Sequence, residues 1–345
     1  MAMLDGKKPF LGFWGELKKP FFVLAPLANV TDHAFRQFIV KYKKPNVIWT
    51  EFVAADGLCH PKGHEVLIRD LKFSENERPI VAQLFTGHPE KMFEAARLVK
   101  EFGFDGVDIN MGCPDKNVMK QGAGAACMKD PELAQRIIRA AMDGVRADGK
   151  EPIPVSVKTR LGVNKDDLEN WLAKVLETKP AAVTLHLRTK KEMSLVPAHW
   201  ERMARAVELR NEHSPETRIL GNGDVKSVRE ARVKCEETGC DGVMIGRGVF
   251  GNPWLFDEGK QTVTVRERLE ATIALTELFE TTWGDTKSFE ILKKHFQAYI
   301  VGFSGARELR NELMLTYSAL AVKEKIGQFI KEKGQWIDGS RVELF

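Results

Sequence analysis

The chain has 345 residues, of which 43% are hydrophobic and 29% are charged. These values indicate a soluble globular protein, long enough for one large domain and a smaller one. The formal net charge of +4 permits an RNA partner without requiring one. The apolar run Phe10–Phe13 is short and contains Gly12, so we expect neither a signal peptide nor a membrane span.

The cysteines argue against a disulfide framework and against a bound metal or iron–sulfur cluster. They are odd in number, and none belongs to a C-x-x-C pair: Cys59, Cys113, Cys127, Cys235 and Cys240. We therefore expect no metal site and a reducing, cytoplasmic location. Nothing in the sequence indicates an obligate protein partner.

Short β-rich runs alternate with amphipathic helical patterns after a lead-in of residues 1–19. The runs are 21–25, 47–52, 80–85, 106–110, 155–159, 182–187, 218–221 and 242–245. Apolar residues at helical spacing lie between the runs, as in 89–102 and 132–145. Strands that alternate with helices over about 235 residues predict an α/β fold, a (β/α)₈ TIM barrel at residues 20–256.

A doubly wound parallel sheet is the alternative α/β fold. That fold normally has a Gly-rich dinucleotide-binding turn after its first strand. The corresponding stretch here, Ala25–Ala28, contains no glycine. We therefore favour the barrel.

The remaining segment, 257–345, has helical patterns at 267–283, 288–299 and 306–327 and no evident strand run. It predicts a smaller all-helical C-terminal domain. It contains 13 Lys and Arg residues and 14 Asp and Glu residues, so the domain as a whole is not basic. Local basic clusters remain as candidates for RNA binding, with a solvated helix face as the alternative: Lys293, Lys294, Arg307 and Arg310.

Polar and cationic residues follow most of the predicted strands. In a TIM barrel the active site lies at the C-terminal ends of the strands, so we take these residues as candidates. In strand order they are Pro26, Leu27 and Ala28; Gln83; Asn110 and Cys113; Lys158 and Arg160; His186 and Arg188; Asn222 and Asp224; and Gly246 and Arg247. Each alone has an ordinary structural explanation; Cys113, for example, can be a small buried hydrophobe.

The last two strands end in loops suited to phosphate. Gly246-Arg247-Gly248 combines glycines, which let backbone N–H groups approach an anion, with a forked arginine donor. The neighbouring loop, 221–224, contains Asn222, Gly223 and Asp224. Because barrels commonly bind phosphate at these two loops, the pair predicts a phosphate pocket.

Two further residues point to a ring cofactor. A cation such as Lys158 at the mouth of a barrel can stabilise negative charge on a reduced flavin ring, and Gln83 could bond the edge of that ring. A ring with a phosphate tail fits FMN better than NAD, which normally requires the glycine fingerprint.

Eight segments, in order and at similar spacing, resemble the tRNA-dihydrouridine synthases. They are 25–32 (APLANVTD), 81–85 (VAQLF), 108–114 (DINMGCP), 121–125 (QGAGA), 157–162 (VKTRLG), 186–189 (HLRT), 221–224 (GNGD) and 246–254 (GRGVFGNPW). The most specific part is N-x-G-C-P followed downstream by K-x-R-x-G.

This resemblance implies an FMN-dependent reduction of the C5=C6 bond of uridines in tRNA. NADPH (or NADH) is the implied reductant, flavin N5 the hydride donor to C6, and Cys113 the acid that protonates C5. The implied cofactor contacts are Pro26, Leu27, Ala28, Gln83, Lys158, His186, Asn222, Gly223, Asp224, Gly246 and Arg247. The implied substrate contacts are Asn110, Arg160 and Arg188, with Lys293, Lys294, Arg307 and Arg310 in the tail.

Two positions depart from the family's usual residues. Leu27 stands where Met is common, and Leu187 stands where Gly is frequent, which can alter the fit of the substrate. Two other functions stay open from the residues alone. One is an FMN-dependent free-pyrimidine reductase of the dihydroorotate-dehydrogenase kind, and the other is a non-catalytic RNA-binding barrel.

Overall fold

The computed structural model describes residues 8–334 and 336–343. The chain forms two compact units that do not follow chain order. The first unit comprises the chain up to Leu27 together with Asn46–Val225 and Glu230–Gly246. The second comprises Ala28–Pro45, Lys226–Arg229 and the chain from Arg247 onward.

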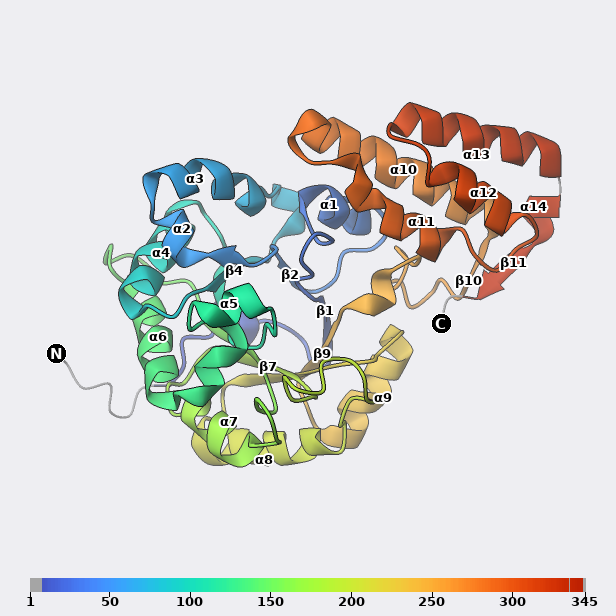
Figure 1. Cartoon of the computed structure of the whole chain (residues 1–345). Coiled ribbons are helices and arrows are strands. Elements are labelled where there is room, and N and C mark those ends of the chain that lie inside the picture. The colour runs from blue at the N-terminus through green and yellow to red at the C-terminus, as the bar shows by residue number, and fades with distance from the viewer. Residues whose placement is uncertain (1–7, 335, 344–345) are drawn as a thin grey trace. The chain divides into compact units, whose positions relative to one another are not determined.

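The first unit is a barrel of parallel strands (Figure 1). The strands are β1 (Phe21–Leu24), β2 (Ile48–Trp49), β3 (Val53–Ala54), β4 (Ile80–Phe85), β5 (Gly106–Asn110), β6 (Val155–Arg160), β7 (Ala182–His186), β8 (Arg218–Asn222) and β9 (Gly242–Ile245). Their order is β1-β9-β8-β7-β6-β5-β4-β2, with β3 also paired to β4. Backbone hydrogen bonds from Asn46 N to Phe22 O (3.0 Å) and from Leu24 N to Val47 O (3.3 Å) close the remaining gap beside β1. The predicted TIM barrel is therefore confirmed.

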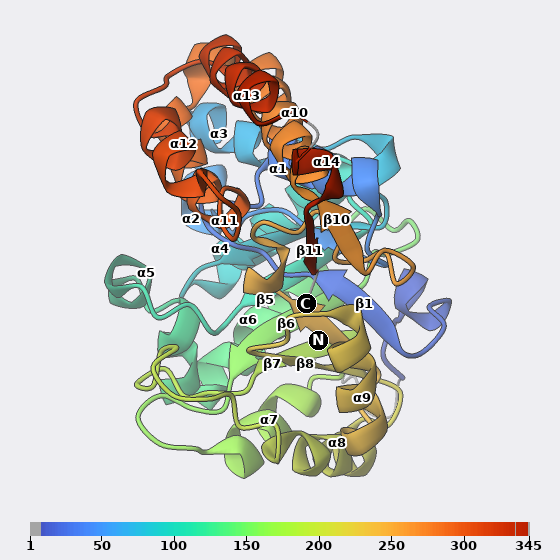
Figure 2. The same cartoon turned by 90° about the vertical axis from the view of Figure 1, so that its right-hand side faces the viewer.

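Helices cover the outside of this barrel, as the view in Figure 2 shows for α7, α8 and α9. The helices of the first unit are α2 (Ala55–Leu58), α3 (Pro61–Leu67), α4 (Pro89–Glu101), α5 (Lys116–Lys120), α6 (Pro131–Gly144), α7 (Leu168–Leu176), α8 (Arg202–His213) and most of α9 (Val228–Thr238). The start of α6 illustrates the local causes. Pro131 occupies the first turn and the Asp130 side chain accepts a hydrogen bond from Leu133 N at 2.9 Å.

The lead-in packs against the barrel. Residues Gly12–Gly15 form a 3₁₀ turn that buries Trp14, whose exposed fraction is 1%. Its ring centroid lies 5.7 Å from that of Phe21 and 5.9 Å from that of Trp49. Because Phe21 begins β1, Trp14 fills the end of the barrel where the strands start. At the other end of the barrel lie the C-terminal ends of the strands, where the sequence predicts the active site.

The second unit is mainly helical, as the tail was predicted to be. Its helices are α1 (His33–Tyr42), α10 (Val265–Trp283), α11 (Lys293–Tyr299), α12 (Ala306–Leu313), α13 (Ala319–Lys333) and α14 (Trp336–Gly339). The helix α1 packs its aromatic face on α11, with ring centroids 5.1 Å apart for Phe35 and His295 and 6.2 Å apart for Phe38 and Tyr299.

The structure corrects the sequence prediction at three places. The predicted strand 47–52 is two short strands, β2 and β3. The predicted helix 306–327 is divided into α12 and α13, because the Ser318 side chain caps a new helix by accepting from Ala321 N at 3.2 Å. The tail is not all helical, since β10 (Thr262–Thr264) pairs antiparallel with β11 (Arg341–Glu343). Three-residue strands are too short to produce a periodic pattern.

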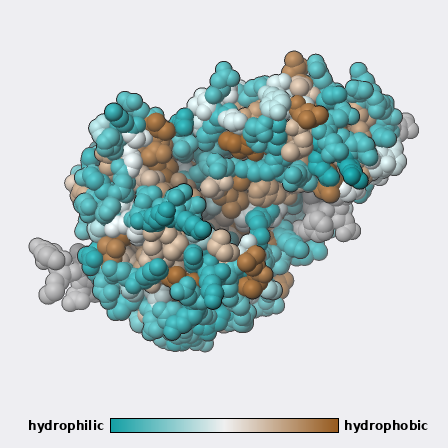
Figure 3. All heavy atoms as spheres, in the orientation of Figure 1, coloured by the Kyte–Doolittle hydropathy of each residue, from teal (hydrophilic) through white to brown (hydrophobic). Residues whose placement is uncertain are grey.

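The face of the molecule in Figure 3 is mostly hydrophilic, with hydrophobic side chains gathered in small patches. Among the described residues, no helix combines the length and the apolar character that crossing a bilayer requires.

Candidate active site

The C-terminal ends of the barrel strands bring the predicted polar residues side by side. In the strand register, Asn110 on β5 pairs with Lys158 on β6. Two residues further along β6, Arg160 pairs with His186 on β7, and His186 pairs with Asn222 on β8. Because alternate residues of a strand share a face, Lys158 and Arg160 project to the same side of β6.

A tight turn follows β5 and carries Cys113. Asn110 Oδ1 accepts hydrogen bonds from Gly112 N at 3.1 Å and from Cys113 N at 2.9 Å. The Cys113 carbonyl accepts from Ala125 N at 2.9 Å. Gly124 approaches so closely that a Cβ there would lie 2.8 Å from Cys113 O, and its φ of +59° also favours glycine. The thiol is thus held on a constrained, partly exposed turn.

The thiol of Cys113 is suited to keeping a proton. Burial raises its pKa above the ordinary value. A backbone hydrogen bond at Asp115 and the charges of Arg160 and Lys158 oppose that rise but do not cancel it. At neutral pH the group is therefore a thiol, which can donate a proton, rather than a nucleophilic thiolate.

Behind this turn a chain of buried hydrogen bonds runs back into the barrel. Asn110 Nδ2 donates to Gln83 Oε1 at 3.0 Å. Gln83 Nε2 donates to Asp108 Oδ2 at 2.6 Å. Asp108 Oδ1 accepts from Ser156 Oγ at 2.6 Å. An ionised carboxylate only accepts, so Asp108 requires the NH₂ group of Gln83 to face it. The Gln83 oxygen then faces Asn110, and the Asn110 oxygen faces the Cys113 turn.

Asp108 and Ser156 were not predicted as site residues. A signal was available for Asp108, which is an acid inside an apolar strand and lies two residues before Asn110, on the same face. Burial raises the pKa of Asp108 to about 6, against the hydrogen bonds from Ser156 and Gln83. Gln83 is 0% exposed and uses both ends of its amide within this chain of bonds. Its contact with a flavin edge stays a prediction.

Lys158 is a partly buried cation whose ammonium makes little use of its hydrogen-bond donors. Burial lowers its pKa to about 8, with a smaller contribution from the charge of Arg160. Within the described part of the chain, its ammonium makes one hydrogen bond, to Asn222 Oδ1 at 3.5 Å. Asn222 in turn donates from Nδ2 to Met244 O at 2.7 Å. An ammonium has three donors, so Lys158 can still bond the acceptor atoms of a ligand at the barrel mouth.

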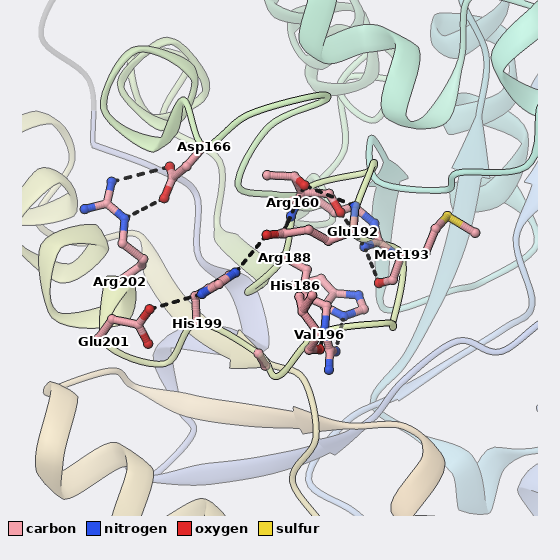
Figure 4. A network of polar contacts seen from close by, with 12 residues as sticks. Arg160, Asp166, His186, Arg188, Glu192, Met193, Val196, His199, Glu201 and Arg202 are labelled. Carbon is pink, nitrogen blue, oxygen red and sulfur yellow. Dashed lines mark hydrogen bonds and ion pairs between the residues drawn. The ribbon is translucent and has the colours of Figure 1, made fainter.

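Arg160 supports the loops around the turn (Figure 4). Its Nε donates to Gly112 O at 2.8 Å, and its Nη1 donates to Thr189 O and Met193 O, both at 3.2 Å. Burial lowers its pKa to about 10, which leaves it charged at neutral pH. The side chain therefore connects the loop after β7 to the residue that precedes Cys113.

Arg188 is 2% exposed, and its guanidinium contacts other residues of the protein. Its Nε donates to Val196 O at 2.6 Å, and its Nη2 forms an ion pair with Asp224. Its Nη1 lies 3.2 Å from His186 Nε2. Because a guanidinium only donates, Nε2 is the accepting nitrogen, and a neutral His186 carries its proton on Nδ1. The structure thus shows Arg188 orienting His186, and its predicted contact with the substrate stays a prediction.

The remaining cofactor candidates of the first unit lie in loops after β1, β8 and β9. Gly223 has a φ of +134°, and a Cβ there would lie 2.7 Å from Ala198 Cβ. A Cβ built on Gly246 would lie 3.6 Å from Leu27 Cδ2, so the segment Pro26–Leu27 and the residue after β9 are neighbours. These placements match the predicted set without showing what the loops bind.

The other candidates belong to the second unit. There Arg307 is exposed, Lys294 and Arg310 are half-buried, and Lys293 is 7% exposed. Lys293 pairs with Glu290 at 2.6 Å. Arg310 Nη1 donates to Ile300 O at 3.0 Å, and Lys294 donates to Asn29 O. Three of the four tail cations thus have partners within their own unit. Ala28 and Arg247 also belong to this unit. The roles of all six in binding stay predictions.

No group of three or more His, Cys, Asp or Glu side chains that could hold a metal occurs among the described residues.

Comparison with known proteins gives a consistent result over nearly the whole chain. Residues 23–333 match the family described as dihydrouridine synthase (Dus). A "Probable tRNA-dihydrouridine synthase" of Staphylococcus aureus (strain COL) is 39% identical over 334 residues, which cover 96% of this chain and 99% of the relative. A "Probable tRNA-dihydrouridine synthase 2" of Bacillus subtilis (strain 168) is 38% identical over 329 residues, which cover 95% of this chain and 98% of the relative.

Among solved structures, a complex of 2-naphthoyl-CoA reductase with 2-naphthoyl-CoA has a TM-score of 0.50 at 10% identity. The match covers 69% of this chain and 49% of that one, and it indicates a shared fold alone. The sequence relatives carry the assignment, and with the DINMGCP turn and the strand-end residues in place, the chain belongs to the dihydrouridine synthase family.

Proposed function

We propose that this protein is a flavoenzyme that reduces the C5=C6 bond of uridines in tRNA, with FMN as its cofactor and NADPH as its reductant. Family membership supports the flavin, and the names of the relatives support tRNA as the substrate. The structural observation that carries the proposal is the pairing of two groups at one barrel mouth. Lys158 is a cation that can donate further hydrogen bonds to a ligand, and Cys113 is a thiol that stays protonated at neutral pH.

The residues at the mouth fit a flavin. Lys158 can donate to acceptor atoms of the ring, where it would stabilise the negative charge of the reduced form. His186, whose Nε2 accepts from Arg188, lies on the same rim, where its ring can contact the flavin. Asn222, Gly223, Asp224, Gly246 and Arg247 would hold the phosphate and the ribityl chain, and Pro26, Leu27 and Ala28 would contact the ring through their backbone. When bound and reduced by NADPH, FMN supplies the hydride that C6 of the uracil receives.

The chain's own acid is Cys113. Its Sγ–H gives a proton to C5, and the resulting thiolate recovers a proton from solvent, to which the turn is partly exposed. Asn110 and Arg160 have a double role in this proposal. Both bond the backbone of the turn, at Cys113 N and Gly112 O, and both lie at the mouth where a uracil edge can be bonded.

A uridine reaches the mouth of the barrel only after it leaves the base stack of the RNA. This step costs a few kcal/mol, and it costs least in a loop that is already unpaired.

We assign RNA binding to residues 257–345, with Arg307 as the exposed cation and Lys293, Lys294 and Arg310 as the further candidates. A cytoplasmic location belongs to the same proposal, because tRNA and NADPH are both available there.

The proposal is tested by separating the two half-reactions without oxygen. The flavin of the purified protein is reduced with NADPH, and the return of its visible absorbance is followed after addition of a substrate. We expect reoxidation by a tRNA transcript that lacks dihydrouridine, and none by free uridine or orotate. Reoxidation by the small pyrimidines alone would identify a free-pyrimidine reductase, and a protein without flavin would contradict the catalytic assignment.

The acid role of Cys113 predicts a selective defect in the second half-reaction. Cys113→Ala should bind flavin and oxidise NADPH as the parent does, because the thiol takes no part in reducing the flavin. Reoxidation by tRNA should slow by a factor of about 10² or more, which is typical of a lost general acid. Cys59→Ala, which removes another partly exposed thiol, is the matched control. Equal reoxidation rates in the parent and in Cys113→Ala would remove the residue from this role.

The hydrogen-bond chain predicts that Asp108 acts by positioning. In Asp108→Asn, the amide oxygen can accept from Gln83 and its NH₂ group can donate to Ser156 Oγ, so the orientation of the Cys113 turn should persist. Asp108→Ala leaves the Gln83 amide unconstrained. We expect kcat with tRNA to fall about tenfold in the Ala variant and to recover in the Asn variant, at equal flavin content. Equal losses in the two variants would indicate that the charge of Asp108 matters rather than amide orientation.

The lowered pKa of Lys158 predicts that its positive charge stabilises the flavin at neutral pH and is lost at alkaline pH. The ammonium is charged below its pKa of about 8 and loses its proton as the pH rises through that value. The visible spectrum of the bound oxidised flavin, titrated without RNA, should therefore change with a midpoint near 8. Lys158→Met should lack this transition and should reduce tRNA slowly at every pH. A transition that persists in Lys158→Met would have to come from another group.

A further inference from the structure

Two cysteines that the proposed reaction does not use meet where α9 joins β9. Cys235 lies in the last turn of α9, and Cys240 lies two residues before β9. Their sulfur atoms are 3.6 Å apart and share a hydrogen bond. The exposed fractions are 7% for Cys235 and 6% for Cys240, so the pair lies near the surface but is almost closed off. Both belong to the first unit, at the end of the barrel where the strands start.

The backbone between them forms a tight helix end. Gly239, with a φ of +73°, turns the chain out of α9. Its N–H donates to Cys235 O at 2.9 Å, which satisfies a carbonyl at the end of the helix. The reversal brings a residue that follows the helix back beside the last helical turn. The folded end of α9 therefore brings the two thiols into contact.

The backbone beside Cys240 is held by its neighbours. Asp241, next to Cys240, accepts hydrogen bonds from Arg210 Nη1 and from Ile219 N, both at 2.7 Å. Gly242 is packed so closely that a Cβ there would lie 2.3 Å from Phe21 O. A disulfide needs an S–S distance of about 2.0 Å. The two sulfur atoms, now 3.6 Å apart, must therefore move closer by rotation of the cysteine side chains and adjustment of the turn.

The pKa of Cys240 differs in direction from the pKa values of Cys59 and Cys127. The contact with the Cys235 sulfur, to which the Cys240 thiol donates, lowers the pKa of Cys240, with a further contribution from Thr238, although burial opposes the shift. The same contact raises the pKa of Cys235. Burial raises the pKa of Cys59 to about 11 and that of Cys127 to about 12. A thiolate is the reactive form of cysteine, so we expect this pair, whose sulfur atoms are in contact, to react before Cys59 and Cys127, with Cys240 as the attacking sulfur.

We propose that Cys235 and Cys240 are a redox-active dithiol that a small hydroperoxide oxidises to an intramolecular disulfide. The Cys240 thiolate attacks one peroxide oxygen, the O–O bond breaks, and Cys240 becomes a sulfenic acid while the other oxygen leaves as water or an alcohol. The Cys235 sulfur then attacks the Cys240 sulfur, gives up its proton, and releases the hydroxyl as water. In total two thiols lose two electrons and two protons, and one hydroperoxide is reduced. A dithiol reductant restores the pair.

The size of the oxidant follows from the burial of the pair. With 6% and 7% of each residue exposed, a hydrogen peroxide molecule can reach the sulfur more readily than a bulky disulfide such as oxidised glutathione. The site does not depend on the flavin or on Cys113, because it lies at the opposite end of the strands. This inference is consequently independent of the proposed function, and either can fail without the other.

The experiment uses a convenient property of the sequence. Cleavage after Lys and Arg yields one peptide, residues 235–247, that contains both cysteines. The folded full-length protein is treated with a few equivalents of hydrogen peroxide, its remaining thiols are alkylated in denaturant, and the peptides are weighed. We expect this peptide to lose two hydrogens and carry no alkyl group, while the Cys59 and Cys127 peptides stay alkylated. The pair should be oxidised at least about tenfold faster than Cys59, because the thiolate fraction sets the rate. Treatment with dithiothreitol should restore two alkylation sites.

Single variants test which sulfur reacts first. In Cys235→Ser, the sulfenic acid of Cys240 has no partner and should be captured by dimedone. In Cys240→Ser, Cys235 should remain a thiol at the same dose. The proposal is overturned if the 235–247 peptide keeps two alkyl groups at a dose that oxidises Cys59. It is also overturned if the disulfide forms as fast in urea-unfolded protein as in the folded one, since the fold would then contribute nothing.

Discussion

The site depends on one buried carboxylate inside the barrel, that of Asp108. Asp108 sits inside the barrel, where its two oxygens accept from Ser156 and Gln83 at 2.6 Å each. An amide side chain looks almost the same in either orientation, and a flipped Gln83 would present an NH₂ group to the NH₂ group of Asn110. Asp108 prevents this because an ionised carboxylate cannot donate. The orientation passes from Gln83 to Asn110, whose oxygen then holds the backbone of Gly112 and Cys113.

Buried charge is expensive unless it is bonded, and the barrel mouth contains several charged groups. Arg160 meets this requirement with three backbone carbonyls, and Arg188 meets it with a carbonyl, a carboxylate and His186. Removing a partner of such a group is destabilising, because an uncompensated buried charge is left behind. The two arginines thus fix the loops after β5 and β7 through the same contacts that keep the arginines themselves in place. Lys158 is the exception, since the one hydrogen bond that its ammonium makes among the described residues spans 3.5 Å.

Much of the barrel was predictable because its strands are buried on both faces and read as short apolar runs ended by turn residues. The bounds of β4, β5 and β9 agree with the runs at 80–85, 106–110 and 242–245. The pattern does not reveal where a short strand breaks, as between β2 and β3. It also does not reveal a three-residue ribbon such as β10 with β11, whose pairing is non-local.

The site shows a similar limit. Strand ends identified Asn110, Lys158 and His186, because parallel strands place their C-terminal residues on one rim. What a side chain bonds is not encoded in its position along the chain. Arg188 occupies a rim position and nevertheless points at Asp224 and His186. Lys293 belongs to a basic cluster in the sequence, yet its ammonium lies 3.9 Å from the centroid of the Tyr317 ring and pairs with Glu290. Charge counted along the chain therefore overestimates the charge available to RNA.

Burial acts on the two principal groups of the mouth with opposite consequences, and the proposed chemistry needs both. A neutral thiol is favoured when water is excluded, so Cys113 keeps the proton that a general acid must deliver. A charged ammonium is disfavoured by the same exclusion, so the pKa of Lys158 falls to about 8 while the group stays mostly charged at neutral pH. An anionic ligand would remove part of that penalty by adding an opposite charge. In the proposed function, the barrel would thus stabilise a reduced, negatively charged ring and hold a protonated acid at the same mouth. A fully hydrated surface would provide neither, because water would shield the lysine and would return the thiol to its ordinary pKa.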